Sequence, residues 1–282
     1  MISSSQSNRK LARWCGVIII AVCGYAAYYM FLAIIDADLV ASVKQKNSVK
    51  VRWLLSLGAN PNAVDPSPNT SAIEIIVRRF SRKESMEDKW TLLAQACDAG
   101  DPEIVRSLLA AGARVNQLNS NGVPPLGIAV ARGNEDVVAV LLRWHAESAP
   151  GDDPVGEAAR KGHLAVLRVL ISAGRKVDTV DEDGMTPLLW ASRRGDLDSV
   201  RLLLNSGANP NRLSGGDSPL TWACRGGFNS PHAYEQVVSE LLHHGARAKM
   251  KDTDGVSPLW CAEQYDQPCI ARILRDAGAP DE

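Results

Sequence analysis

The stretch GMTPLLWASRRGDLDSVRLLLNSGANPN, from Gly184 to Asn211, decides the fold of this chain, because variants of it recur along the sequence. NGVPPLGIAVARGNEDVVAVLLRWHA precedes it, and GVSPLWCAEQYDQPCIARILRDAGAP follows near the C-terminus. The glycines that close the repeated unit stand 33 residues apart between Gly174 and Gly207, and again between Gly245 and Gly278. This period predicts a stack of small units, each of which buries its apolar face on its neighbours.

Each unit has the local signals of two short helices. In the unit that starts at Thr186, the threonine is a favoured N-cap, and Pro187 suits a first helical position that needs no N–H. The apolar residues of VRLLL, from Val200 to Leu204, follow the spacing of one helix face. Gly207 is suited to end that second helix in the left-handed conformation, and ANPNRLSGGD then forms a turn-rich finger.

The pattern closely resembles the ankyrin repeat, whose consensus reads TPLHxAAxxGH and then VVxLLLxxGAxxN. The resemblance covers roughly residues 37–282 and implies an all-α solenoid of stacked helix-turn-helix units with β-hairpin-like fingers. Repeat units are expected to start at Thr91, Pro124, Asp153, Thr186, Ser218 and Ser257. A weaker first unit is expected at 37–62. Residues 63–90, with the helix-like NTSAIEIIVRRF, are interpreted as a degenerate or inserted unit.

Three departures from the pattern are visible. His145 stands where the closing glycine of its unit belongs, and the finger after it is shortened and runs straight into Asp153 and Pro154. The segment Asn229–Tyr234 is an insertion between the two helices of its unit.

The N-terminus predicts a membrane anchor. After a short tail, 1–13, residues 14–35 contain no charge and are long enough to cross a bilayer as one helix, so we expect a transmembrane signal-anchor there. Because Gly24-Tyr25-Ala26 is a passable cleavage site, a cleaved signal peptide stays an alternative, and a buried core helix is a third. Basic residues unopposed by acids precede the span, which favours a cytoplasmic N-terminus and extracytoplasmic repeats, periplasmic in a bacterium: Arg9, Lys10 and Arg13.

Composition and motifs indicate that this chain is neither an enzyme nor a nucleic-acid-binding protein. It has 282 residues, with 31 Lys and Arg against 32 Asp and Glu, so it lacks the basic excess of a nucleic-acid-binding domain. No His, Cys or Asp cluster has metal-ligand spacing, and no phosphate loop or nucleophile elbow is present. We expect no enzyme activity, cofactor, metal, nucleic acid or small-molecule substrate. Cys97 and Cys224 are too many units apart to bond, whereas Cys261 and Cys269 could approach each other.

The candidate binding residues come from the two places before the glycine that ends each first helix. The resemblance implies that these places face the concave groove, and six of the eight in four successive units are basic: Arg132, Arg160, Lys161, Arg193, Arg194 and Arg225. Arginine suits carboxylates, which predicts a partner with an acidic surface. The alternative is that helix dipoles alone favour these cations and that acids such as Glu157, Asp196 and Asp198 neutralise them.

Aromatic and finger-tip residues complete the candidate site. Trp190 and Trp222 hold the same place in adjacent units, so we expect them to neighbour each other near the groove, either as packing or as an exposed anchor. The finger tips are expected to offer further contacts through Leu118, Ser120, Asn121, Val123, Val180, Glu182, Asp183 and Met185.

Three hypotheses of function follow. The favoured one is a membrane-tethered module that binds a protein partner through its groove and finger tips. The alternative is an exported soluble ankyrin protein, released by cleavage, that acts as an inhibitor or stress-protective binding partner. An enzyme or nucleic-acid binder that uses the basic groove is the least supported.

Overall fold

A computed structural model of the chain describes residues 3–63, 91–149, 151–226 and 231–280, with the side chains of 3–22 and Pro231 left out. The helix expected in NTSAIEIIVRRF therefore lies outside the described residues. The chain divides into two compact units, Met1–Asn121 and Gly122–Glu282, and each is described by itself.

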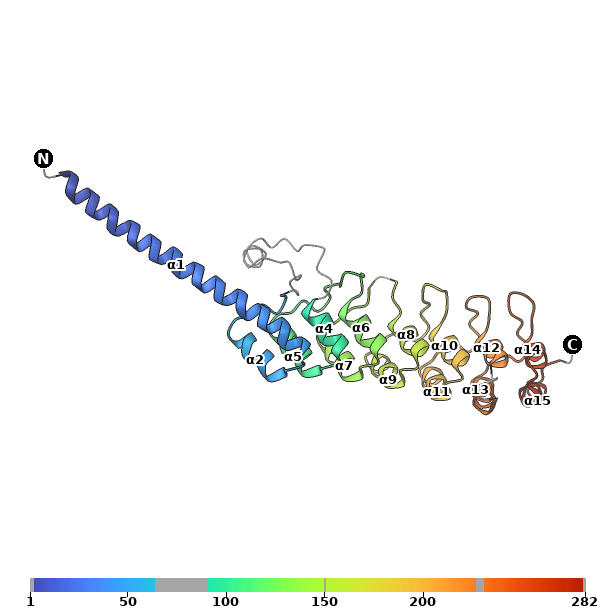
Figure 1. Cartoon of the computed structure of the whole chain (residues 1–282). Helices are drawn as coiled ribbons and strands as arrows, with labels where there is room; N and C mark the ends of the chain where they lie inside the picture. Colours follow the sequence, from blue (N-terminus) through green and yellow to red (C-terminus); the bar gives the residue numbers. More distant parts are fainter. Residues whose placement is uncertain (1–2, 64–90, 150, 227–230, 281–282) are drawn as a thin grey trace. The chain divides into compact units, whose positions relative to one another are not determined.

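The described part of unit 1 consists of helices that pack as hairpins (Figure 1). They are α1 (Ser3–Lys44), α2 (Ser48–Ser56), α4 (Leu92–Ala99) and α5 (Pro102–Ala110). Helix α1 packs on α2 and α4, and α5 packs on both α2 and α4. Side chains such as Leu39, Leu54 and Leu108 are fully buried between these helices.

Helix α1 does not end where the expected anchor ends, at Ile35, but continues to Lys44. Its residues 23–31 are largely exposed, whereas Leu32, Ile35, Leu39 and Val43 are buried at helical spacing. The last third of α1 is therefore a core helix of unit 1, an interpretation that the sequence had ranked third. Asp36 strengthens this packing because its Oδ1 accepts the Asn60 N–H at 2.6 Å.

The described helices of unit 2 pack in two rows (Figure 1). The first row contains α6 (Pro125–Arg132), α8 (Pro154–Lys161), α10 (Pro187–Arg194), α12 (Pro219–Arg225) and α14 (Pro258–Gln264). The second row contains α7 (Glu135–Arg143), α9 (Leu164–Ser172), α11 (Leu197–Asn205), α13 (Pro231–His243) and α15 (Pro268–Asp276). Neighbours within each row pack on one another, and each first-row helix packs on its second-row partner.

The helix ends of unit 2 follow the predicted local chemistry. Thr186 Oγ1 accepts the Leu189 N–H at 3.2 Å and so caps α10. Gly195 and Gly207 end α10 and α11 with φ of +69° and +91°, the left-handed region that glycine adopts at little cost. His145, which replaces the closing glycine of its unit, has φ +56°, so the backbone keeps the shape that the glycine would have given it.

The fingers between the helix pairs are turns stabilised by side chains. Asp181 Oδ1 accepts the N–H groups of Asp183 and Met185 at 3.1 and 2.8 Å, and Asp252 forms the equivalent turn before α14. The fingers are expected to resemble β-hairpins. In the described part of the chain, the pairing of this kind is an isolated antiparallel bridge between Ser214 and Asp217.

The predicted insertion Asn229–Tyr234 lengthens a helix. Its described residues from Pro231 onward form the first turn of α13, which has 13 residues where α11 has 9. This extra turn places Tyr234 beside the C-terminal end of α10.

Candidate functional site

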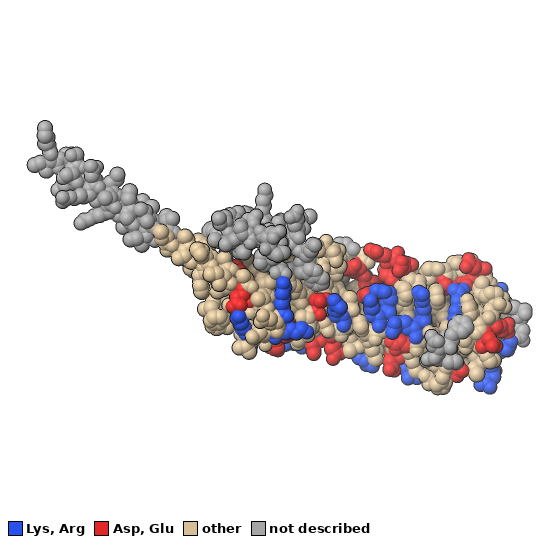
Figure 2. Space-filling model, in the orientation of Figure 1, with Lys and Arg blue, Asp and Glu red and all other residues tan. Residues whose placement is uncertain are grey.

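The predicted basic residues all lie at the C-terminal ends of first-row helices in unit 2. We call Arg132, Arg160, Lys161, Arg193, Arg194 and Arg225 the basic row. All of them are exposed except Arg225, which is partly buried. Figure 2 shows Lys and Arg side chains recurring along this part of the surface, with acidic side chains beside them. The row therefore exists as a surface feature, but it is not uniformly positive.

Two tryptophans and two arginines form a stacked cluster within the row. The Arg193 guanidinium lies 4.7 Å from the Trp222 ring centroid and 5.3 Å from that of Trp190, and Arg225 lies 5.6 Å from Trp222. Cation–π contacts of this kind contribute about 0.5–1 kcal/mol each at exposed sites. The Arg193 guanidinium thus contacts both indole rings and connects the two tryptophans. Its positive charge lies at the surface of α10 and α12.

Two residues that the sequence did not indicate, Asp181 and Tyr234, form hydrogen bonds that hold the cluster in place. Asp181 Oδ2 accepts the Trp190 indole N–H at 2.7 Å, and the Tyr234 hydroxyl donates to the Arg193 carbonyl at 2.9 Å. The Tyr234 ring lies against Gly195 and Gly226, where a Cβ atom would collide with it. These contacts orient the cluster before any partner binds.

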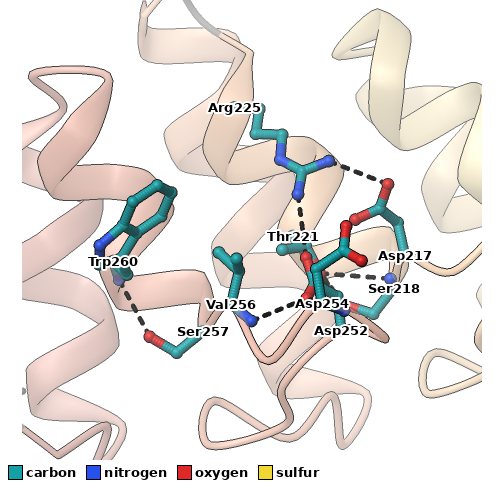
Figure 3. Close-up of polar contacts among 9 residues, drawn as sticks. All are labelled: Asp217, Ser218, Thr221, Arg225, Asp252, Asp254, Val256, Ser257 and Trp260. Carbon is teal, nitrogen blue, oxygen red and sulfur yellow. Dashed lines mark hydrogen bonds and ion pairs between the residues drawn. The ribbon is translucent and has the colours of Figure 1, made fainter.

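Arg225 differs from the rest of the row because it is held by two carboxylates. Its guanidinium bonds Asp217 Oδ2 at 2.9 Å and Asp252 Oδ2 at 3.0 Å, as Figure 3 shows. The Asp252 side chain is 1% exposed. Burial raises the pKa of Asp217, although Arg225 opposes this shift. Arg225 therefore links α12 to the fingers before α12 and α14.

The other cations of the row differ in how far acids neutralise them. Arg160 forms two hydrogen bonds with Glu157, at 2.7 and 2.8 Å, as the neutralisation hypothesis expects. Asp196 instead caps α11 by accepting from Ser199. Lys161, Arg193 and Arg194 have no carboxylate partner among the described residues. These three residues therefore carry positive charge that no described carboxylate offsets.

The finger-tip residues are distributed over both units. In unit 1, Leu118 is 49% exposed, and Ser120 and Asn121 are exposed. In unit 2, Val180, Glu182 and Asp183 are exposed and Val123 is half-buried. Met185 is 8% exposed, so the expectation of an exposed tip is wrong there: its sulfur packs beside Gly215.

The described cysteines divide into buried and exposed thiols. Among the residues whose side chains the structure describes, Cys97, Cys224 and Cys261 are buried, Cys23 and Cys269 are exposed, and none of these five forms a disulfide. Burial raises the pKa of Cys97 and of Cys224 well above the ordinary thiol value. Within the described residues, no group of three His, Cys, Asp or Glu side chains could hold a metal ion.

The helix pairs, left-handed glycines and fingers define a repeat protein of the kind that binds other proteins along its stack. A family model for ankyrin repeats, in three copies, matches residues 39–152 and 144–214. The chain therefore belongs to the ankyrin repeat family, whose domains are typically non-catalytic binding modules.

Curated relatives share parts of the repeat region. Mouse cyclin-dependent kinase 4 inhibitor B is 39% identical over 116 residues, which are 39% of this chain and 88% of that protein. The Caenorhabditis elegans ankyrin repeat and KH domain-containing protein mask-1 is 38% identical over 121 residues, 40% of this chain and 4% of the relative. A fungal ankyrin repeat protein, SAT10 of Stachybotrys chartarum, is 28% identical over 226 residues, 67% of this chain and 11% of its own length. This chain thus spans a small part of several of the proteins it matches.

Solved structures show the same fold. The ankyrin repeat domain of human ASB11 superposes with a TM-score of 0.67 at 25% identity, covering 86% of this chain and 99% of that one. An ankyrin repeat domain from Acinetobacter baumannii gives a TM-score of 0.62 at 27% identity over 67% of this chain and 98% of that domain.

Proposed function

We propose that this chain is a membrane-tethered interaction module whose basic row binds a protein partner with an acidic surface. The observation that carries the tether is the continuity of α1, which runs from Ser3 to Lys44 without a break. One helix thus joins an apolar N-terminal stretch to the core of the first repeat.

The exposed apolar part of α1 supports a bilayer crossing. Among the described residues, the segment Cys23–Lys44 is long and apolar enough to cross, with a mean hydropathy of 1.6. However, 39% of an apolar 18-residue stretch within this segment is buried inside the protein, because side chains such as Leu32 and Ile35 pack in unit 1. We therefore place the crossing in the charge-free residues 14–31, which rise about 27 Å at 1.5 Å per residue, close to the hydrocarbon thickness.

We propose that the N-terminus is cytoplasmic and the repeats are extracytoplasmic. Arg9, Lys10 and Arg13 lie on the N-terminal side of the crossing without acidic neighbours. Resistance to carbonate extraction would support the tether, and protease treatment of spheroplasts would test the topology. Repeats that survive while an extracytoplasmic control protein is digested would contradict it.

The arginine–tryptophan cluster supports binding through the row. Trp and Arg dominate binding hot spots, and Arg193 is held between two indoles with its charge unpaired by any carboxylate in the described residues. A partner carboxylate could therefore bond a pre-oriented guanidinium at a low entropy cost. The names of the cyclin-dependent kinase inhibitors among the relatives are compatible with a protein partner for this chain.

The partner test combines crosslinking of the full, anchored chain with row variants. The triple variant Arg160→Ser, Arg193→Ser, Arg194→Ser should weaken binding of the crosslinked partner by at least about tenfold and flatten its salt dependence. Arg272→Ser, an exposed arginine on α15 in the second row, is the matched control and should leave binding unchanged. Equal affinity of the triple variant and the parent would exclude the row.

A soluble, exported form is the second candidate. Cleavage after Ala26 would remove the first 26 residues and leave the buried face of α1, which begins at Leu32, in place. Such a product keeps the core of unit 1 and could act as a released inhibitor. Intact-mass measurement of the N-terminus distinguishes the two forms.

A further inference from the structure

The shortened finger predicted before Asp153 leaves a hollow in unit 2. Residues 144–153 connect α7 to α8, whereas the longer stretch 173–186 connects α9 to α10. A hollow of ≈ 400 Å³ lies at this place, between α6, α8 and the finger before α10.

The side of the hollow that α6 and the residues before it form, which we call the floor, is apolar and made of small side chains. Val123, Gly127, Val130 and Ala131 line it from α6 and its approach. Gly127 and Ala131 hold the places that Leu189 and Arg193 occupy in α10. The missing side-chain volume leaves room for a guest group over this floor.

The rim of the hollow is acidic. Its lining includes six carboxylates, Asp152, Asp153, Glu157, Asp181, Glu182 and Asp183, and a single cation, Arg160. We call this feature the acidic hollow. Arg160 is committed to Glu157, and Asp181 holds Trp190 and its own turn. The exposed side chains of Asp152, Glu182 and Asp183 thus leave a surplus of negative charge at the mouth.

Asp153 is the most buried of these carboxylates. It is 8% exposed, and its Oδ1 caps α8 by accepting the Val155 N–H at 3.1 Å. Its Oδ2 is buried without a hydrogen bond of ordinary geometry. Burial raises the pKa of Asp153, although hydrogen bonds from the Gly156 backbone, the Thr179 side chain and the Val155 backbone oppose this shift. A cation inside the hollow would complete its interactions.

We propose that the acidic hollow takes the side chain of an arginine or lysine from the partner protein, beside the basic row. The apolar floor suits the aliphatic stem of such a residue, and the rim carboxylates suit its charged end. An organic cation fits better than a metal ion, since no metal-holding group of three ligands occurs among the described residues. This inference rests on the proposed function and extends it: the partner presents alternating charge, with acids for the row and a base for the hollow.

The test is an NMR titration that needs no knowledge of the partner. The full chain in detergent micelles, labelled with ¹⁵N, is titrated with N-acetyl-arginine N-methylamide, and its neutral isostere N-acetyl-citrulline N-methylamide serves as the ligand control. We expect saturable shifts at the amides of Gly127, Ala131 and Gly151 with the arginine derivative. The double variant Asp152→Asn, Asp183→Asn should weaken this binding roughly fivefold. Asp254→Asn, which removes an exposed finger carboxylate outside the hollow, should not.

The inference is overturned if the arginine and citrulline derivatives shift these amides equally, or if the double variant binds the arginine derivative as tightly as the parent. The two proposals can fail separately. Loss of partner binding in the row variant without any arginine binding rejects the hollow and leaves the proposed function standing. Saturable arginine binding together with row variants that bind the partner normally supports the hollow and rejects the row.

Discussion

Replacing Arg225 by alanine should destabilise unit 2, in contrast to the other cations of the basic row. The change removes two ion pairs, and within the described residues the Asp252 carboxylate keeps hydrogen bonds from the backbone N–H groups of Asp254 and Val256. Removing one partner of a fully buried pair costs about 3–5 kcal/mol. The Arg225 side chain is 24% exposed, so water compensates part of the loss and we expect about 2 kcal/mol.

Thermal and urea unfolding of the full chain, followed by tryptophan fluorescence and circular dichroism, measures this loss. A change of about 2 kcal/mol lowers Tm by roughly 4–8 °C for a domain of this size. Lys161→Ala, an exposed cation of the same row, is the control and should stay within about 0.5 kcal/mol of the parent.

A double variant separates the ion pair from simple loss of packing. Asp252→Asn removes the buried charge, so adding it to Arg225→Ala should cost less than the two single losses together. If Arg225→Ala unfolds like the parent, or if the two losses simply add, the carboxylate contacts do not stabilise the fold and the reasoning is refuted.

The remaining predictions concern the core, the thiols and a strained turn. Leu39→Ala should cost unit 1 about 3 kcal/mol by hydrogen exchange, whereas the exposed Ile34→Ala on the same helix should change little. Maleimide at neutral pH should label Cys269 in the native protein but reach Cys97 only in urea, as mass spectrometry can check, because burial shields that thiol and raises its pKa. His145→Gly should stabilise unit 2 by about 1 kcal/mol in urea melts, since it relieves a positive φ in a residue with a Cβ.

The sequence could predict what depends on local chemistry. Thr186 as a cap, Gly207 as a left-handed helix end and His145 in a glycine place all follow from neighbouring residues. The buried last third of α1 could also have been found, because Leu32, Ile35 and Leu39 already have helical spacing. The charge-free stretch instead predicts an anchor that ends at Ile35, whereas the helix continues through Asp36 to Lys44.

The candidate site was predictable in position but not in contacts. The ends of the first-row helices locate Arg193 and Arg225, yet the sequence cannot show that Asp252, 27 residues away, holds one of them. Tyr234 gave no signal because its place depends on how the insertion folds into α13. The shortened finger was visible, but the hollow also needs the small side chains of α6 brought beside it.

Because helix α1 is unbroken, its length sets the angle by which the first repeat is rotated about the helix axis. Each residue of an α-helix turns the chain by about 100° and advances it by 1.5 Å. One residue inserted between Cys23 and Phe31 would therefore rotate the first repeat by more than a quarter turn relative to the N-terminal half of the helix. Seven inserted residues would return it to within about 20° of its original facing. The number of residues between the crossing and Leu32 therefore sets the direction in which the first repeat faces. What matters is the fraction of a helical turn that this number leaves over, more than the length itself.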